Sequence, residues 1–137
     1  MAVYTKLDQE NIEKILSNYS IGKLDKFEGI EEGIENSNFL IWTNKQKYIL
    51  TIYEKRVKEE DLPFFSKLMI DLNNSGISCP VPIINKNNSP ITEFHNKKLM
   101  IVSFIEGQAK DVLSPENCKS VGVEAAKIHE NTKNFKI

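Results

Sequence analysis

The sequence lacks the cysteine patterns that bind zinc or carry redox chemistry. Its two cysteines, Cys79 and Cys118, are far apart and form no Cys-x-x-Cys pair, which predicts two reduced thiols in a cytosolic protein. The first six residues have no apolar core of the kind found in signal peptides. The apolar run Leu99–Val102 is far too short to span a bilayer. These absences predict a soluble, cytoplasmic protein.

The sequence also lacks an excess of charge of either sign. It has 18 Lys and Arg residues against 19 Asp and Glu residues, a net charge of −1, and Arg56 is its only arginine. We therefore expect neither nucleic acid nor a membrane as a partner. With 40% hydrophobic residues among 137, the chain can form a core and is one domain at most.

Hydrophobic alternation predicts five strands, at roughly residues 24–30, 38–43, 47–53, 91–94 and 98–104. In the third strand, a period of two separates the side chains into one face with Tyr48, Leu50 and Ile52 and another with Ile49, Thr51 and Tyr53. Both faces are largely apolar, so we expect this strand to be covered on both sides.

Capping residues predict two helices before the last strand. The first is expected to begin at Asp8, to close at Gly22 and to carry an apolar face of Ile12, Ile15, Leu16 and Tyr19. The second is expected to follow the acidic residues 59–61, with Pro63 in its first turn and Gly76 as its C-cap. Its buried stripe is predicted to be Phe65, Leu68, Met69 and Leu72.

A third helix is predicted after the last strand. Ser114 is its expected N-cap, with Pro115 in the first turn. One of its faces is apolar, with Cys118, Val121, Ala125 and Ile128. His129 is expected to be a packed structural residue, and His95 an exposed turn residue. The predicted fold class is α+β, a five-stranded antiparallel sheet flanked by a helix, with one more helix after a connector.

Five segments in this order and spacing carry a family resemblance: residues 33–39 (GIENSNF), 48–56 (YILTIYEKR), 61–65 (DLPFF), 79–82 (CPVP) and 102–107 (VSFIEG). Together they resemble bacterial homoserine kinase of the aminoglycoside phosphotransferase and choline kinase-like type. The resemblance implies a protein kinase-like amino-terminal lobe over residues 1–106, followed by the hinge and the first helix of the carboxyl-terminal lobe over residues 107–137. It also implies the activity of that family, phosphorylation of L-homoserine by ATP and Mg²⁺ in threonine biosynthesis.

The resemblance implies that residues 33–38 cover the nucleotide. Cradling a phosphate requires several backbone N–H groups that converge on one point, which glycine and short polar residues permit. This loop has one glycine, Gly33, so the side chains of Asn36, Ser37 and Asn38 would add donors. An ordinary polar hairpin is the alternative.

The third strand and the connector would complete the nucleotide site. By resemblance, Ile49 roofs the adenine and Thr51 stands where kinases have a phosphate-binding lysine, a departure since a hydroxyl cannot hold phosphates as an ammonium does. Either Lys55 or Arg56 would reach the phosphates instead, unless both are only solvated. The backbone of Ser103, Phe104 and Ile105 would read the adenine edge, although an edge strand entering a turn fits these residues equally well.

No catalytic residue or metal ligand is expected in this chain. The family carries them on a His-x-Asp loop and a later Asp, whereas His129 is followed here by Glu130. We therefore expect an amino-terminal fragment that is inactive alone and that associates with itself through the unpartnered face of its last helix. The alternatives are a kinase for choline or an aminoglycoside, and a non-catalytic nucleotide-binding or interaction module.

Overall fold

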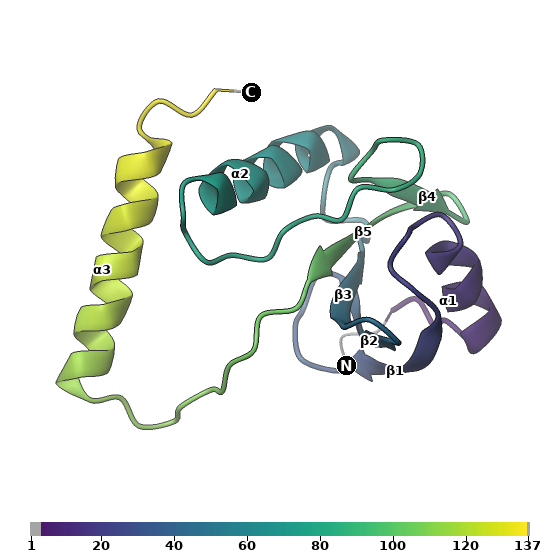
Figure 1. Cartoon of the computed structure of the whole chain (residues 1–137), viewed down its shortest axis with the longest axis horizontal. Coiled ribbons are helices and arrows are strands. Elements are labelled where there is room, and N and C mark those ends of the chain that lie inside the picture. Colours follow the sequence, from purple (N-terminus) through teal and green to yellow (C-terminus); the bar gives the residue numbers. More distant parts are fainter. Residues whose placement is uncertain (1–3, 137) are drawn as a thin grey trace.

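The protein is an antiparallel sheet with one helix packed on it and two further helices to the side (Figure 1). The computed structural model describes residues 4–136. Its elements are α1 (Gln9–Leu16), β1 (Leu24–Ile30), β2 (Ser37–Thr43), β3 (Lys47–Ile52), the 3-10 turn η1 (Glu59–Asp61), α2 (Leu62–Asn74), β4 (Thr92–Phe94), β5 (Lys97–Ser103) and α3 (Pro115–Thr132). The strand order is β1-β2-β3-β5-β4. The predicted α+β class and five-stranded antiparallel sheet are confirmed, with strand ends shifted by about one residue.

The core lies between α1 and one face of the sheet. Alternate residues of β2 and β3 point into it, and Ile41 and Leu50 are fully buried. They pack with Ile12 and Ile15 of α1. Burying such side chains contributes roughly 1.5–3 kcal/mol each, so this face supplies most of the stability.

Helix α1 begins as predicted but ends earlier. Asp8 accepts the N–H of Asn11 in a capping box, which satisfies the exposed donors of the first turn. The helix ends at Leu16, not at Gly22, because Ser17 and Asn18 donate side-chain hydrogen bonds back to the carbonyls of the last turn. Tyr19 lies beyond the helix and is nevertheless buried, with its hydroxyl 2.7 Å from that of Thr92.

The predicted end of α2 is confirmed, and the prediction of its buried face is partly wrong. Gly76, at φ +79°, follows the C-cap, and the N–H of Ile77 donates to the carbonyl of Leu72 at 3.0 Å, the pattern of a glycine-terminated helix. The fully buried positions are Leu62 and Ser66, whereas Phe65 is 40% exposed. Leu62 and Ser66 are four residues apart and share a face, and Phe65 lies about 100° around the helix from Ser66.

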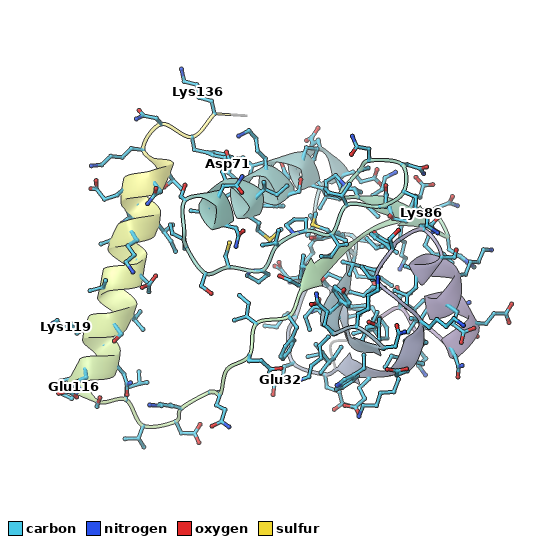
Figure 2. The ribbon with its side chains drawn as sticks, viewed as in Figure 1. Glu32, Asp71, Lys86, Glu116, Lys119 and Lys136 are labelled. Carbon is cyan, nitrogen blue, oxygen red and sulfur yellow. The ribbon has the colours of Figure 1, made fainter. Side chains whose placement is uncertain are left out.

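Helix α3 stands away from the sheet at the end of the extended segment 104–113 (Figure 1). Its predicted cap is present, since Ser114 accepts the N–H of Asn117. Residues 118–131 are all exposed, so the prediction of a packed His129 is wrong, because no described element covers that side. In Figure 2, Glu116 and Lys119 mark the end of α3 that lies farthest from α2.

The carboxyl end of α3 contacts α2. The ring of Phe135 lies 5.4 Å from that of Phe64, edge to face, and the ammonium of Lys67 lies 4.7 Å from the centre of the Phe135 ring. None of the helices within residues 4–136 is both long enough and apolar enough to cross a membrane.

Candidate functional site

The sheet face opposite α1 carries an apolar row across three strands. In the ladder, Leu40 of β2 pairs with Ile49 of β3, and Ile49 pairs with Val102 of β5. All three side chains are half-buried. On the reverse face, the neighbouring row Phe39, Leu50 and Ile101 is 3%, 0% and 0% exposed.

This difference corrects the expectation that β3 is covered on both sides. The face toward α1 is closed, because α1 supplies the apolar partners there. On the opposite face Met100, the ladder partner of Thr51, is also 0% exposed. The row Leu40–Ile49–Val102, which we call the platform, remains partly open. An open, flat apolar strip on the central strands of a sheet can receive one face of a planar aromatic ring.

A polar pair borders the platform on the next rung of the ladder. Asn38 pairs with Thr51, and the Thr51 hydroxyl donates to Oδ1 of Asn38 at 2.8 Å. This bond occupies the amide oxygen and leaves Nδ2 of Asn38 as a donor, with no hydrogen bond to any described residue. Thr51, where kinases carry a lysine, therefore acts on its neighbour and adds no charge.

The loop between β1 and β2 reaches out from the same end of the sheet. Gly33 adopts φ +118°, a conformation that residues with a Cβ rarely take, and residues 31–35 are exposed. In Figure 2, Glu32 of this loop lies on the side of the sheet nearest to the segment that leads to α3. Residues 31–35 are thus open to solvent at this end of the sheet.

Arg56 lies at this loop and not at the platform. Its Nη1 is 3.9 Å from Oε1 of Glu35, and the two side chains are 67% and 60% exposed. Exposed pairs of this kind contribute roughly 0–1 kcal/mol, so the guanidinium is easily released to another anion. Together with Lys55 it lines a hollow of about 430 Å³ beneath the loop.

Two of the predicted site residues already make hydrogen bonds within the protein. The Ser37 side chain is fully buried, and its hydroxyl accepts the N–H groups of Tyr4 and Thr5, each at 2.9 Å. Asn36 uses its amide oxygen to accept the N–H of Glu54 at 3.3 Å. The Ser37 hydroxyl is therefore not available to a ligand, whereas the Asn36 nitrogen is.

The connector begins at a residue that is paired on both sides and then becomes free of pairing. Ser103 exchanges hydrogen bonds with the backbone of Val81, its N–H donating and its hydroxyl accepting, both at 2.9 Å. Beyond it, Phe104 is half-buried and Ile105 is 43% exposed. Among the described residues, the backbone of 105–113 has no hydrogen-bond partner, so its polar groups can serve a ligand.

A smaller hollow lies where β5 meets this connector. Its volume is about 320 Å³, and its lining includes Ser103, Phe104 and Lys47. The Lys47 ammonium lies 2.6 Å from Oε1 of Glu106 and 5.0 Å from the centre of the Phe104 ring. A larger hollow, about 520 Å³, is elsewhere, between α1 and the turn before β1, and its lining includes Lys86, seen beside α1 in Figure 2. None of the predicted site residues lines that hollow.

Leu40 and Val102 were not among the site residues predicted from the sequence, although both are parts of the platform. The period of two in residues 37–43 places Leu40 on one face with Asn38, and antiparallel pairing brings both beside Ile49 and Thr51. Alternation could therefore have identified them. Residues 4–136 contain no group of three or more His, Cys, Asp or Glu side chains arranged to hold a metal ion.

The chain resembles a set of phosphotransferases. It matches the sequence profile of the phosphotransferase enzyme family over residues 26–135. It is 43% identical over 137 residues to the homoserine kinase of Parvibaculum lavamentivorans, covering 100% of this chain and 43% of that protein. It is 42% identical over 135 residues to the homoserine kinase of Methylobacterium radiotolerans, covering 98% of this chain and 42% of that protein.

Two solved structures share the fold. Spectinomycin phosphotransferase APH(9)-Ia, in complex with ADP and spectinomycin, superposes with a TM-score of 0.73 at 14% identity over 93% of this chain and 39% of that one. An aminoglycoside phosphotransferase from Alicyclobacillus acidocaldarius gives 0.74 at 12% identity over 98% and 38%. The protein kinase-like fold expected from the sequence is thereby confirmed, and the chain spans about two-fifths of the length of these proteins. This chain belongs to the phosphotransferase enzyme family.

Proposed function

We propose that this chain is the nucleotide-binding part of a homoserine kinase. The observation that carries the proposal is the partly open platform Leu40–Ile49–Val102, next to the polar pair Asn38–Thr51. An adenine ring would rest on the platform and gain roughly 25 cal/mol for each Å² of apolar surface removed from water. The phosphates would then extend toward Asn38 and the loop. The ADP bound to spectinomycin phosphotransferase, which has the same fold, supports this assignment.

Within this proposal, each residue near the phosphates has a distinct task. Backbone N–H groups from Gly33 to Asn38 and the Nδ2 atom of Asn38 donate to phosphate oxygens. Thr51 fixes the orientation of the Asn38 amide, and Arg56 exchanges Glu35 for a phosphate. We leave the Ser37 hydroxyl out of the site because it is buried and bonded within the protein.

The adenine edge is assigned to the connector. The free backbone groups from Phe104 and Ile105 onward, at the hollow beside Lys47, are placed to donate and accept at the end of β5. Ser103 positions this segment by its pairing with Val81. Mg²⁺ would arrive with ATP and neutralise its phosphates. We assign none of the described residues to the cation, because they offer no cluster of ligands.

We propose L-homoserine as the acceptor alcohol because of the similarity to homoserine kinases. Two relatives, at 43% and 42% identity, are homoserine kinases, and this chain spans 43% and 42% of their lengths. The proposal therefore concerns the activity of a protein that contains this chain together with the remaining part of the relatives.

A chimera tests that activity. This chain replaces the corresponding amino-terminal part of the Parvibaculum lavamentivorans kinase, and ADP release is measured with L-homoserine, choline or kanamycin as the acceptor. Release with L-homoserine alone supports the proposal, and the unmodified relative is the control. Release with choline or kanamycin instead would refute the substrate. An inactive chimera, together with micromolar ATP binding by the 137-residue chain, would favour a non-catalytic module.

We further propose that the 137-residue chain associates with itself through α3. Val121 is 66% exposed and Ile128 is 37% exposed on one face of this helix, and Leu113 just before it is 60% exposed. Contiguous apolar side chains in water favour association with another surface. A second copy of the same face is the partner present at the highest concentration in a purified sample.

A further inference from the structure

Four segments of the chain meet at the carboxylate of Glu54, directly after β3. The Thr5 hydroxyl donates to its Oε1 at 2.5 Å, and the Ser37 hydroxyl donates to the same oxygen at 2.7 Å. The Lys97 ammonium donates to Oε2 at 2.6 Å and to the Thr5 hydroxyl at 2.6 Å. This cluster, which we call the clasp, ties together the amino-terminal segment, the end of the β1–β2 loop, β3 and β5.

The clasp holds the loop as well as the sheet. Ser37 is the first residue of β2, directly after the loop, and its hydroxyl also accepts the N–H groups of Tyr4 and Thr5. The Tyr4 hydroxyl donates to the carbonyl of Ile34 at 2.7 Å, inside the loop. The N–H of Glu54 donates to the side chain of Asn36 at 3.3 Å. Ile34 and Asn36 of the loop and Ser37 at the start of β2 are thus connected to Glu54, directly or through the amino-terminal segment.

The clasp is charged and largely shielded from water. The Glu54 side chain is 11% exposed, and that of Lys97 is 41% exposed. Burial alone would raise the pKa of Glu54, but the hydrogen bonds from Lys97, Thr5 and Ser37 and the charge of Lys97 together hold it below its ordinary value. Every oxygen and hydroxyl of the cluster has a partner, so its geometry is defined.

We propose that Glu54 is a positioning residue for the loop that covers the nucleotide phosphates, acting through Ser37 and the amino-terminal segment. The inference rests on the proposed function. It adds that phosphate recognition depends on the clasp, whereas adenine recognition by the platform does not. Glu54 itself is not assigned a contact with the nucleotide, because both of its oxygens are already occupied.

The test compares ATP with adenosine on the 137-residue chain. Trp42, the only tryptophan, lies on β2 with its side chain on the platform side, so its fluorescence reports binding of both ligands. The Glu54→Gln variant keeps the shape and loses the charge. We expect it to weaken ATP binding about tenfold and to leave adenosine binding within about twofold, as suits the loss of charge-assisted hydrogen bonds.

Two further variants serve as a control and as a second test of the clasp. Glu93→Gln removes an exposed carboxylate that pairs with Lys98 on β5 and has no link to the loop, and it should leave both affinities unchanged. Thr5→Val removes one clasp hydroxyl at constant volume, and it should weaken ATP binding about threefold with adenosine unchanged. Thr5→Val also serves if the Glu54→Gln chain does not fold. Hydrogen exchange of the amides in residues 31–37 should be faster in both clasp variants than in the Glu93→Gln control.

The outcomes separate this inference from the proposed function. Equal losses for ATP and adenosine would overturn the positioning role, because a merely structural residue would affect both. Unchanged ATP binding and unchanged exchange in Glu54→Gln and Thr5→Val would overturn it as well. A parent chain that binds neither ligand would refute the proposed function, and the positioning role would fall with it. Faster exchange alone would then identify Glu54 as no more than an anchor for the loop.

Discussion

Ile49 and Leu50 are adjacent in β3 and face opposite sides of the sheet, so truncating each one tests whether the platform is open. Leu50 is fully buried between Phe39 and Ile101. Leu50→Ala removes its packing and leaves a closed cavity, which costs about 2–5 kcal/mol of the free energy of unfolding. Ile49 is half-buried, so Ile49→Ala loses only part of its transfer free energy and leaves a space that water fills. We expect a cost of about 1 kcal/mol.

The effect on ligand binding should be the reverse. An isoleucine side chain that covers about 40 Å² of an adenine face contributes roughly 1 kcal/mol, so Ile49→Ala should weaken ATP binding about fivefold. Leu50→Ala should leave the affinity of the folded fraction within about twofold. Urea unfolding followed by circular dichroism gives the stabilities, and Trp42 fluorescence at low temperature gives the affinities.

Two results would contradict an open platform. If Ile49→Ala lowers the free energy of unfolding as much as Leu50→Ala does, the Ile49 side chain is covered by protein, and no face remains for a purine. If Leu50→Ala loses ATP affinity while Ile49→Ala keeps it, the ligand lies on the sheet face toward α1 and not on the platform.

Three other predictions follow from particular residues. Because the pKa of Glu54 is lowered, its contribution to the free energy of unfolding is present above its ordinary pKa of 4.5 and is lost as the pH falls through the folded-state value. Urea midpoints should therefore fall less steeply with decreasing pH in Glu54→Gln than in the parent chain. An equal dependence of the midpoint on pH in both chains would contradict the clasp. Gly33→Ala should weaken ATP binding about threefold or more with little change in melting temperature, because φ +118° in an exposed loop disfavours a Cβ. Gly122→Ala in α3, with open space around it and no place in the proposed site, is the control and should leave ATP binding unchanged. Replacing both Val121 and Ile128 with Glu should shift the chain to monomers in sedimentation velocity, and a parent chain that is already monomeric at about 100 μM would contradict self-association through α3.

Much of the fold could be predicted because local signals and tertiary packing agree. Alternation in residues 47–52 indicates the central strand, and Ser114 followed by Pro115 marks the start of α3. The predictions were wrong where tertiary contacts decide the outcome. The buried face of α2 depends on what packs against Leu62 and Ser66, and burial of His129 depends on a partner element that the described residues do not supply.

The site was predictable in part for the same reason. The loop at Gly33 and the position of Ile49 follow from local sequence and resemblance. The commitment of the Ser37 hydroxyl does not, because its partners Tyr4, Thr5 and Glu54 are distant in sequence. Glu54 gave no signal either, since a single carboxylate after a strand is most often solvated.

We propose that a purine rests on the platform Leu40–Ile49–Val102. Titration of the isotope-labelled 137-residue chain with ATP, followed by amide and methyl NMR shifts, tests this binding mode. We expect the largest methyl shifts at Leu40, Ile49 and Val102, accompanied by amide shifts in residues 33–38. Shifts confined to the larger hollow at Glu13, Lys23 and Lys86, or no shifts at millimolar ATP, would contradict it.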